Sequence, residues 1–162
     1  MSAVLPEQAA VWSYPVDSYE HISEEQVIMN MINSFLGRMH LASHLELLND
    51  AKKALVKEGV EYFNKLSEAK KTALPFLPKG FCNFGDELVV SGFKCQDKIY
   101  LAFWNLGEVG EKCIDLGIDI ASAKVAYPKN NCLDYSVDGN SLKITFTEEY
   151  QARFFEIQLK ER

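Results

Sequence analysis

The stretch that decides the fold class is residues 72–86, TALPFLPKGFCNFGD, near the middle of the 162-residue chain. It holds two prolines and two glycines, and a proline blocks continuation of a helix because it lacks an amide donor and clashes with the preceding turn. The spacing of apolar residues also changes here, from a helical period to a period of two. We therefore expect this stretch to be a packed linker between two segments rather than a helix or a strand. It would separate residues 1–74 from residues 75–162.

Before the boundary the pattern is helical. Ser23 and Gln26 form a capping-box signature, which predicts a helix from Glu24 to about residue 40, roughly 25 Å long. Its apolar positions form one broad face: Val27, Ile28, Met31, Ile32, Phe35, Leu36 and Met39. Such a face must be covered by the later strands or by a second copy, so a homodimer or a larger assembly is expected.

A second helix is predicted after Asn49. Lysines lie on one side of this helix, and apolar residues recur at helical spacing on the other: Leu55, Val56, Val60, Phe63 and Leu66. Gly59 lowers helix propensity by about 1 kcal/mol relative to alanine, which indicates a site of close packing.

After the boundary, alternating residues predict seven strands: 88–93, 98–104, 112–116, 123–127, 133–137, 142–146 and 153–159. Residues 99–104 are apolar on both faces, so this strand is expected at the centre of a sheet. Asp138-Gly139 predicts a hairpin in which both turn residues have positive φ. Short strands with turn signals indicate an antiparallel β-sandwich, and helices followed by strands give the α+β class.

Composition excludes several classes of partner. The net charge is −6 with no basic stripe, which argues against nucleic acid and against an anionic membrane surface. No apolar run is long enough to span a bilayer. The N-terminal residues lack a secretory pattern, so a cytoplasmic location is expected. The widely spaced cysteines then favour free thiols at Cys82, Cys95, Cys113 and Cys132.

Motifs for metal, cofactor or nucleophilic chemistry are weak. His40 and His44 are four residues apart on or just after the first expected helix, with Glu46 nearby, but a metal site needs a third ligand and Leu41 replaces the glutamate of H-E-x-x-H. We favour histidines that bond the carbonyls of a helix end. Glycine-rich phosphate loops and the G-x-S-x-G motif are absent from the sequence. We expect no metal and no cofactor.

Trp12 and Tyr14 form a short aromatic segment that follows Glu7. Flat aromatic faces stack on sugars, and a carboxylate bonds paired hydroxyls, so this segment fits carbohydrate binding. Ordinary packing of amphipathic rings is the alternative.

These residues carry a resemblance to a known family. The chain resembles the α-galactosidases (melibiases) of glycoside hydrolase family 36 in the order and spacing of short blocks: 6–8 (PEQ), 12–15 (WSYP), 30–33 (NMIN), 36–41 (LGRMHL), 43–45 (SHL), 55–63 (LVKEGVEYF) and 74–80 (LPFLPKG). The resemblance is concentrated in residues 1–85.

The resemblance implies a retaining hydrolase of terminal α-galactosides with a central (β/α)8 barrel, a C-terminal antiparallel β domain and two catalytic aspartates. Those aspartates lie in Lys-Trp-Asp and Ser-Asp contexts in the family, and neither context occurs here. We therefore expect no catalytic residue in this chain and an accessory role within a parent enzyme.

A complete barrel needs about 250 residues. The N-terminal helices are accordingly expected to be a remnant of the end of a TIM barrel, with a last barrel strand near residues 4–10, followed by the antiparallel β-sandwich. By resemblance, Glu7 and Trp12 would line the sugar pocket of the intact enzyme, at the carboxyl end of that strand. The partners implied are the rest of the catalytic barrel and, only in the intact enzyme, an α-galactoside.

Two other functions stay open. An independent carbohydrate-binding β-sandwich would present aromatic side chains on one sheet face, for which Tyr100 and Trp104 are candidates, although their apolar neighbours favour the core. A small enzyme in its own right would need a catalytic pair that the sequence does not reveal.

Overall fold

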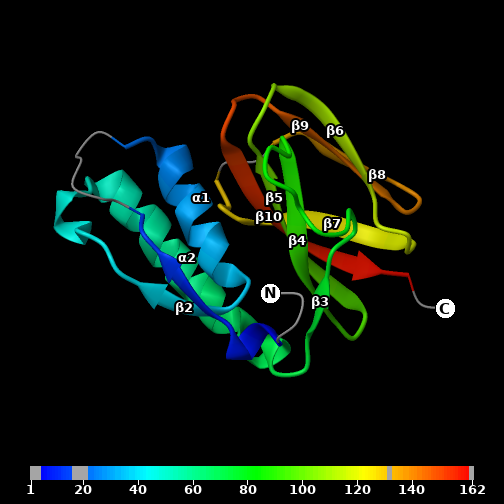
Figure 1. The fold of residues 1–162 in the computed structure, drawn as a ribbon, viewed down its shortest axis with the longest axis horizontal. Helices are drawn as coiled ribbons and strands as arrows, with labels where there is room; N and C mark the ends of the chain where they lie inside the picture. The colour runs from blue at the N-terminus through cyan, green and yellow to red at the C-terminus, as the bar shows by residue number, and fades with distance from the viewer. Residues whose placement is uncertain (1–4, 16–21, 131–132, 161–162) are drawn as a thin grey trace.

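The computed structural model describes residues 5–15, 22–130 and 133–160 and has the α+β fold expected from the sequence. Two helices with a small parallel sheet lie beside a β-sandwich (Figure 1). The first half of the chain contains, in order, η1 (Pro6–Gln8), β1 (Ala10–Ser13), α1 (Glu24–Phe35), β2 (Arg38–Leu41), η2 (Leu45–Leu47) and α2 (Asp50–Lys70). No helix in these described ranges is long and apolar enough to cross a bilayer.

Helix α1 begins as predicted and ends earlier. The amide of Gln26 donates to the hydroxyl of Ser23 at 3.1 Å, and the Ser23 amide donates back to the Gln26 side chain at 2.8 Å, which completes the capping box. The prediction that the helix continues to about residue 40 is wrong, because the chain leaves the helix after Phe35 and forms β2. The Arg38 amide donates to the carbonyl oxygen of Ala9 at 2.6 Å, which starts the pairing of β2 with the β1 segment.

Helix α2 begins after Asn49, whose side chain accepts the amide of Lys52 at 3.0 Å. The close packing expected at Gly59 is confirmed, since a Cβ there would lie 2.8 Å from the end of the Met31 side chain. Lys70, in the last turn of α2, is buried, which the sequence pattern did not indicate.

The remaining strands are β3 (Leu74–Phe76), β4 (Leu88–Cys95), β5 (Lys98–Asn105), β6 (Gly110–Asp115), β7 (Ile120–Tyr127), β8 (Tyr135–Asp138), β9 (Ser141–Phe146) and β10 (Gln151–Leu159). They form a five-stranded sheet, β3-β4-β5-β10-β7, and a three-stranded sheet, β6-β9-β8, both antiparallel. All seven predicted strands are present, and β5 is central as expected. Strand β3 lies within the stretch that the sequence assigned to a boundary.

The hairpin between β8 and β9 is confirmed at its predicted place, with a different turn. Asp138 pairs with Ser141, so the two loop residues are Gly139 and Asn140. Of these, Gly139 alone has positive φ, at 61°. A two-residue hairpin loop that starts with a glycine of positive φ corresponds to a type II′ turn rather than a type I′ turn.

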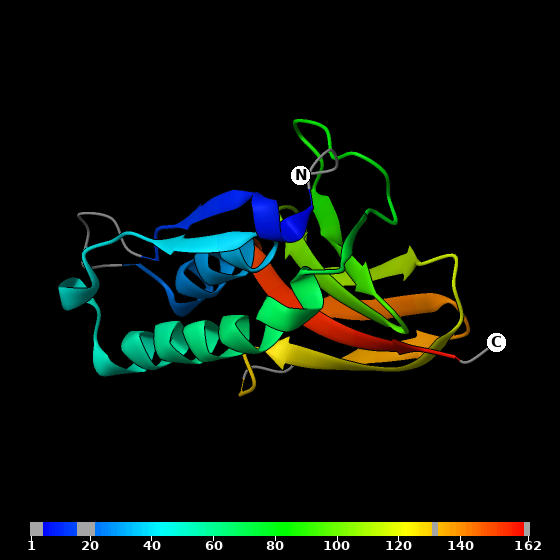
Figure 2. The same cartoon turned by 90° about the horizontal axis from the view of Figure 1, so that it is seen from below.

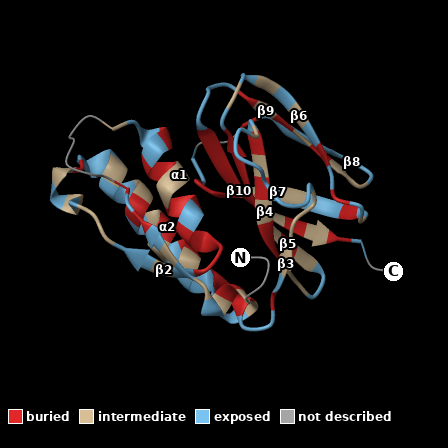
Figure 3. Cartoon of the chain, in the orientation of Figure 1, coloured by how far each residue is buried: buried red, intermediate tan, exposed pale blue. Residues whose placement is uncertain are grey.

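Two hydrophobic clusters hold the molecule together. One lies between the two sheets of the sandwich. The other lies between the five-stranded sheet and the helices, and it contains the apolar residues of α1 (Figures 2 and 3). The α1 residues Val27, Ile28, Met31, Ile32 and Phe35 are fully buried within the chain. The face that suggested a homodimer is thus covered by the chain's own α2 and β-sandwich.

Candidate functional site

The first candidate site is built on the parallel pair of strands β1 and β2. Its register pairs Ala10 with Arg38 and Trp12 with His40. The strands are joined through α1, and α2 follows β2, so this part of the chain runs strand–helix–strand–helix. Parallel sheets occur almost only inside larger α/β folds. In the described part of the chain, each of these two strands has one edge without a partner strand.

One face of the β1–β2 pair packs on the helices. Ser13 is fully buried, and its hydroxyl donates to the carbonyl oxygen of Asn30 in α1 at 3.0 Å. Met39 packs against the helical core. Because side chains alternate along a strand, Trp12 and His40 point to the opposite face, where both are exposed.

Three rings gather on this open face, and we call Trp12, Tyr14 and His40 the aromatic cluster. The ring centroids of Trp12 and Tyr14 lie 6.1 Å apart with nearly parallel planes, and the His40 ring lies 5.4 Å from Trp12. Trp12 is 57% exposed and Tyr14 52% exposed, so their flat faces are available to a ligand. The cluster lies toward the carboxyl ends of the strands, where α/β folds place their ligand sites. Tyr14 and His40 were not singled out together by the sequence, because their proximity depends on the pairing of β1 with β2.

Glu7 lies at the other end of β1. The strand expected over residues 4–10 begins only at Ala10, and Glu7 belongs to the 3-10 helix η1 that precedes it. Residue 4 lies outside the described residues. One carboxylate oxygen of Glu7 is buried and has no hydrogen-bond partner among the described residues. The structure therefore places Glu7 at the amino end of β1 and the aromatic cluster at the carboxyl end. Their proposed joint role in a sugar pocket stays a prediction.

His40 and His44, which the sequence placed on or just after the first helix, both lie after the end of α1. His40 lies in β2, and His44 precedes η2, where its Nδ1 lies 3.0 Å from a carboxylate oxygen of Glu46. A backbone hydrogen bond, followed by the bond to His44, lowers the pKa of Glu46. Within the described ranges, no three potential ligands come together in a way that would hold a metal ion.

The more buried carboxylates serve the fold. Glu25 receives two hydrogen bonds from the guanidinium group of Arg153, at 2.7 and 2.8 Å. Glu156 lies between Lys98 and Lys124, at 2.7 and 3.1 Å. Burial acts to raise the pKa of Glu156, but the hydrogen bonds from the two lysines outweigh it and lower the pKa. These carboxylates are tied to cations rather than directed at a ligand.

The candidate aromatic residues of the sandwich are not an exposed row. Trp104 is only 7% exposed and belongs to the core between the sheet and the helices. Tyr100 is half-buried and stacks on Phe93, with 5.1 Å between ring centroids. The expectation that these two residues belong to apolar surroundings is confirmed.

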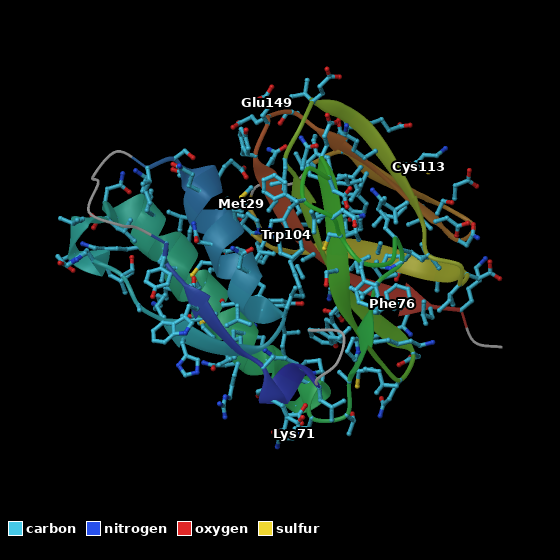
Figure 4. The ribbon with its side chains drawn as sticks, viewed as in Figure 1. Met29, Lys71, Phe76, Trp104, Cys113 and Glu149 are labelled. Carbon is cyan, nitrogen blue, oxygen red and sulfur yellow. The ribbon has the colours of Figure 1, made fainter. Side chains whose placement is uncertain are left out.

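A second candidate site was missed by the sequence reasoning. A groove runs between α1 and the five-stranded sheet, and it consists of a cavity of about 450 Å³ that adjoins one of about 150 Å³. Figure 4 shows Met29 and Trp104 approaching each other across it. We call it the α1–β4 groove and define it by the residues that line it: Met29 and Asn33 from α1, Leu36 just after its end, and Val89, Ser91 and Trp104 from the sheet. The spacing of 29, 33 and 36 along one helix stripe was the available signal, but the facing strands lie far away in sequence.

The cysteines that the structure describes, Cys82, Cys95 and Cys113, are free thiols. Cys82 is exposed and lines both cavities of the α1–β4 groove. Cys113 is exposed on β6. The fourth cysteine, Cys132, lies outside the described residues.

The sequence matches no protein-family model and no curated protein. Solved structures do share the fold. The galactosidase domain of an α-galactosidase–sucrose kinase matches 93% of this chain with a TM-score of 0.55 and 15% identity. A family 36 α-galactosidase from Geobacillus stearothermophilus, solved with stachyose, matches 94% with a TM-score of 0.52 and 10% identity. The chain spans 22% of the length of each. In fold, the chain resembles one domain-sized part of these glycoside hydrolases.

Proposed function

We propose that this chain acts as the C-terminal, non-catalytic part of an α-galactosidase-like glycoside hydrolase. The observation that carries the proposal is the strand–helix–strand–helix segment joined to a β-sandwich, an arrangement shared with two α-galactosidases over nearly the whole chain. In this proposal β1, α1, β2 and α2 are the last quarter of a (β/α)8 barrel. The free edges of β1 and β2 accept the remaining barrel strands, which satisfies their backbone groups.

The β-sandwich in this proposal braces the last two barrel helices. Its five-stranded sheet already buries the apolar face of α1, and Arg153 of β10 is bonded to Glu25 at the start of α1. The barrel supplies the catalytic carboxylates and the α-galactoside site. The open face of β1 and β2 looks into the barrel interior, so Trp12 and its cluster form part of the wall of that site. We propose Glu7 as a second residue of that wall.

The first test is hydrolysis of p-nitrophenyl α-galactoside by the purified chain. We expect no release of nitrophenol above that of a buffer blank. Sustained turnover that follows the chain through chromatography would contradict the proposal, because an accessory part contains no catalytic pair.

The second test uses the polypeptide that contains this chain together with a complete barrel. Trp12→Ala is expected to lower kcat/KM for a galactoside by about 10-fold or more, an effect of about 1.4 kcal/mol. Val137→Ala, an exposed position on β8, is the matched control and should leave kcat/KM unchanged. The same measurement on Glu7→Ala decides whether that carboxylate belongs to the site. If kcat/KM is unchanged in both Trp12→Ala and Glu7→Ala, neither residue belongs to the α-galactoside site.

The aromatic cluster itself favours a second candidate function, an independent carbohydrate-binding module. Its rings are exposed and stacked without help from any other chain. Titration of the isolated chain with melibiose and raffinose, followed by tryptophan fluorescence, separates the two functions. Saturable binding that Trp12→Ala abolishes would favour a module that acts alone.

A further inference from the structure

We propose that the α1–β4 groove is a binding site for an uncharged, mainly apolar small molecule that presents a hydrogen-bond acceptor, with an aromatic ketone as the model ligand. The groove shares no residue with the aromatic cluster, and binding there does not require a catalytic barrel. Four features support the site: its size, its apolar walls, its lack of charge and a buried indole N–H group that has no acceptor.

The groove has the size of a ligand site. Its larger cavity of about 450 Å³ falls within the range of about 300–1,000 Å³ that is typical of small-molecule pockets. The adjoining cavity is about 150 Å³, a volume that holds one benzene ring in an apolar protein interior. Leu36, Cys82 and Ser91 line both cavities, so a two-ring molecule can extend from one into the other.

The hollow has a cause in the sequence of the sheet. Ser91 of β4 pairs with Ala102 of β5, and both side chains are short, which leaves space above this part of the sheet. Two residues away on each strand, Val89 pairs with Trp104, and these larger side chains form a wall. Met29 contributes apolar surface from α1. Mostly apolar walls with a few polar groups are typical of pockets that bind small molecules.

The walls of the groove select an uncharged ligand. In the part of the chain that the structure describes, no residue that lines either cavity carries a formal charge. Asn33 and Ser91 supply neutral polar groups, an amide and a hydroxyl. A charged ligand would lose part of its hydration here without gaining an opposite charge, which is unfavourable.

Trp104 determines which polar group the ligand should carry. Its Nε1 atom is buried and has no hydrogen-bond partner among the described residues, although the side chain lines the larger cavity. A buried N–H group without an acceptor destabilises the protein, because it has lost its hydrogen bonds to water. An indole N–H can only donate. The ligand group that relieves this cost is therefore an acceptor, for which a ketone oxygen is suitable.

The probe for this site is 6-propionyl-2-(dimethylamino)naphthalene, a neutral two-ring ketone whose emission moves to shorter wavelength when it leaves water. The measurement uses Trp12→Phe, in which Trp104 is the one remaining tryptophan. Excitation of Trp104 should give saturable energy transfer to the bound probe, because the two would be in contact. We expect one site with a Kd of about 100 μM or lower, as ordinary ligand efficiency gives for a molecule of this size.

Two analogues, measured by competition with the probe, test the chemistry of recognition. The 6-propyl analogue keeps the size of the probe and lacks the carbonyl oxygen, so it should bind about 3-fold more weakly or worse, the effect of one neutral hydrogen bond. The 6-carboxylate analogue is ionised at neutral pH and should bind at least about 10-fold more weakly than the probe.

Variants and a thiol reporter locate the binding. Ser91→Leu and Asn33→Phe fill the groove from the sheet and from α1, and each should abolish energy transfer. Ser136→Leu, at an exposed position of β8 in the other sheet, is the matched control and should leave the Kd unchanged. Saturating probe should also slow the alkylation of Cys82 by N-ethylmaleimide at least about 3-fold and leave Cys113 unchanged, as mass spectrometry would show.

Circular dichroism identifies a groove variant that fails to fold, and the other groove variant then decides. Four results would overturn the assignment of the site. The first is energy transfer that does not saturate, and the second is equal affinity for the ketone and the 6-propyl analogue. The third is binding that persists in the folded groove variants. The fourth is energy transfer that appears only at high concentration of the chain, because the probe would then occupy an interface between two copies.

Discussion

Arg153 and Glu25 form an ion pair that joins the two halves of the fold. Arg153 is fully buried at the start of β10, and both of its terminal nitrogens donate to the carboxylate of Glu25 in the first turn of α1. The side chain of Gln151 lies at the edge of the same carboxylate, 3.5 Å away. Removal of one partner of a buried ion pair leaves an uncompensated charge inside the protein, which costs more than the pair itself contributes.

We therefore predict that Glu25→Gln lowers the free energy of unfolding by about 3–5 kcal/mol. Lys71→Gln breaks the exposed pair between Lys71 and Glu68 and should cost less than about 1 kcal/mol. Urea unfolding of both variants beside the unchanged chain measures the difference. Similar small losses for the two variants would mean that the buried pair is solvated or replaced in the variant.

Lys70 is a buried cation at the end of α2. Its amine donates to the carbonyl oxygens of Phe35 and Gly37, at 3.2 and 2.8 Å, and lies 3.6 Å above the centre of the Phe63 ring. Burial lowers the pKa of Lys70 from 10.5 to about 7. Between these values the unfolded chain binds more protons than the folded one, so the unfolding free energy rises with pH across this window.

We therefore predict that the unfolding free energy depends on pH in this range because of Lys70. From about pH 7 to about pH 9.5, the unfolding free energy of the unchanged chain should rise relative to that of Lys70→Met by at least about 1 kcal/mol. The exposed variant Lys71→Met should keep the slope. Above about pH 10 the sign reverses, because burial raises the pKa of Tyr62 and Tyr127 and their stabilising contribution is lost as they ionise. If the unfolding free energies of Lys70→Met and of the unchanged chain change in parallel from about pH 7 to about pH 9.5, Lys70 is not the cause of the pH dependence.

At the scale of elements, Gly37 sets how closely β2 approaches β1. A Cβ at this position would overlap the carbonyl oxygen of Ala9 and lie 2.8 Å from a methyl group of Val11. Gly37→Ala is predicted to lower the unfolding free energy by about 1–3 kcal/mol, because backbone atoms must move. Hydrogen exchange should show the largest loss of protection in β1 and β2.

Gly59→Ala is the matched control for Gly37→Ala. Its new methyl group would meet the flexible end of Met31, and alanine has the better helix propensity by about 1 kcal/mol. We expect its unfolding free energy to stay within about 1 kcal/mol of the unchanged value. A loss at Gly59 as large as that at Gly37 would contradict the distinction between backbone and side-chain crowding.

The helices and strands that the sequence predicted correctly are those whose apolar residues recur with one clear period. Both helices and seven strands follow directly from apolar spacing. The end of α1 was misplaced because Met39 fits a helical stripe and also the inward position of β2, and periodicity cannot separate the two in so short a stretch. Strand β3 was missed because Pro75 argued for a boundary. An edge strand that pairs only with β4 tolerates a proline.

The candidate site was predictable only where neighbours in sequence are neighbours in space. Trp12 and Tyr14 are two residues apart, and their stacking is visible in the WSYP segment. His40 joins them only through the register of a parallel pair. The α1–β4 groove requires that α1 face strands more than fifty residues later, as the numbers of Leu36 and Val89 show. The burial of Lys70 was not predicted, because the sequence pattern placed the lysines of this helix only in general terms, opposite its apolar side.

At the scale of the whole molecule, the two segments predicted from the sequence share one core. The hydrophobic cluster that contains Ile32 and Phe35 of the helical segment also contains Trp104 and Phe154 of the sandwich. A sheet with apolar residues on both faces loses one of its two cores if the helices detach. The boundary at residues 74 and 75 therefore divides the chain by pattern, and we expect the two segments to be coupled in stability.

That coupling predicts a single cooperative unfolding transition, which the two tryptophans can test. In Trp12→Phe the remaining tryptophan, Trp104, lies between the helices and the sheet, so its fluorescence reports on their contact. Far-UV circular dichroism of the same variant reports mainly on α1 and α2. The two urea curves should coincide, as a two-state transition requires. If the ellipticity of the helices is lost at lower urea than the burial of Trp104, or the reverse, the helices and the sandwich are separate folding units, and the ion pair between Arg153 and Glu25 does not couple them.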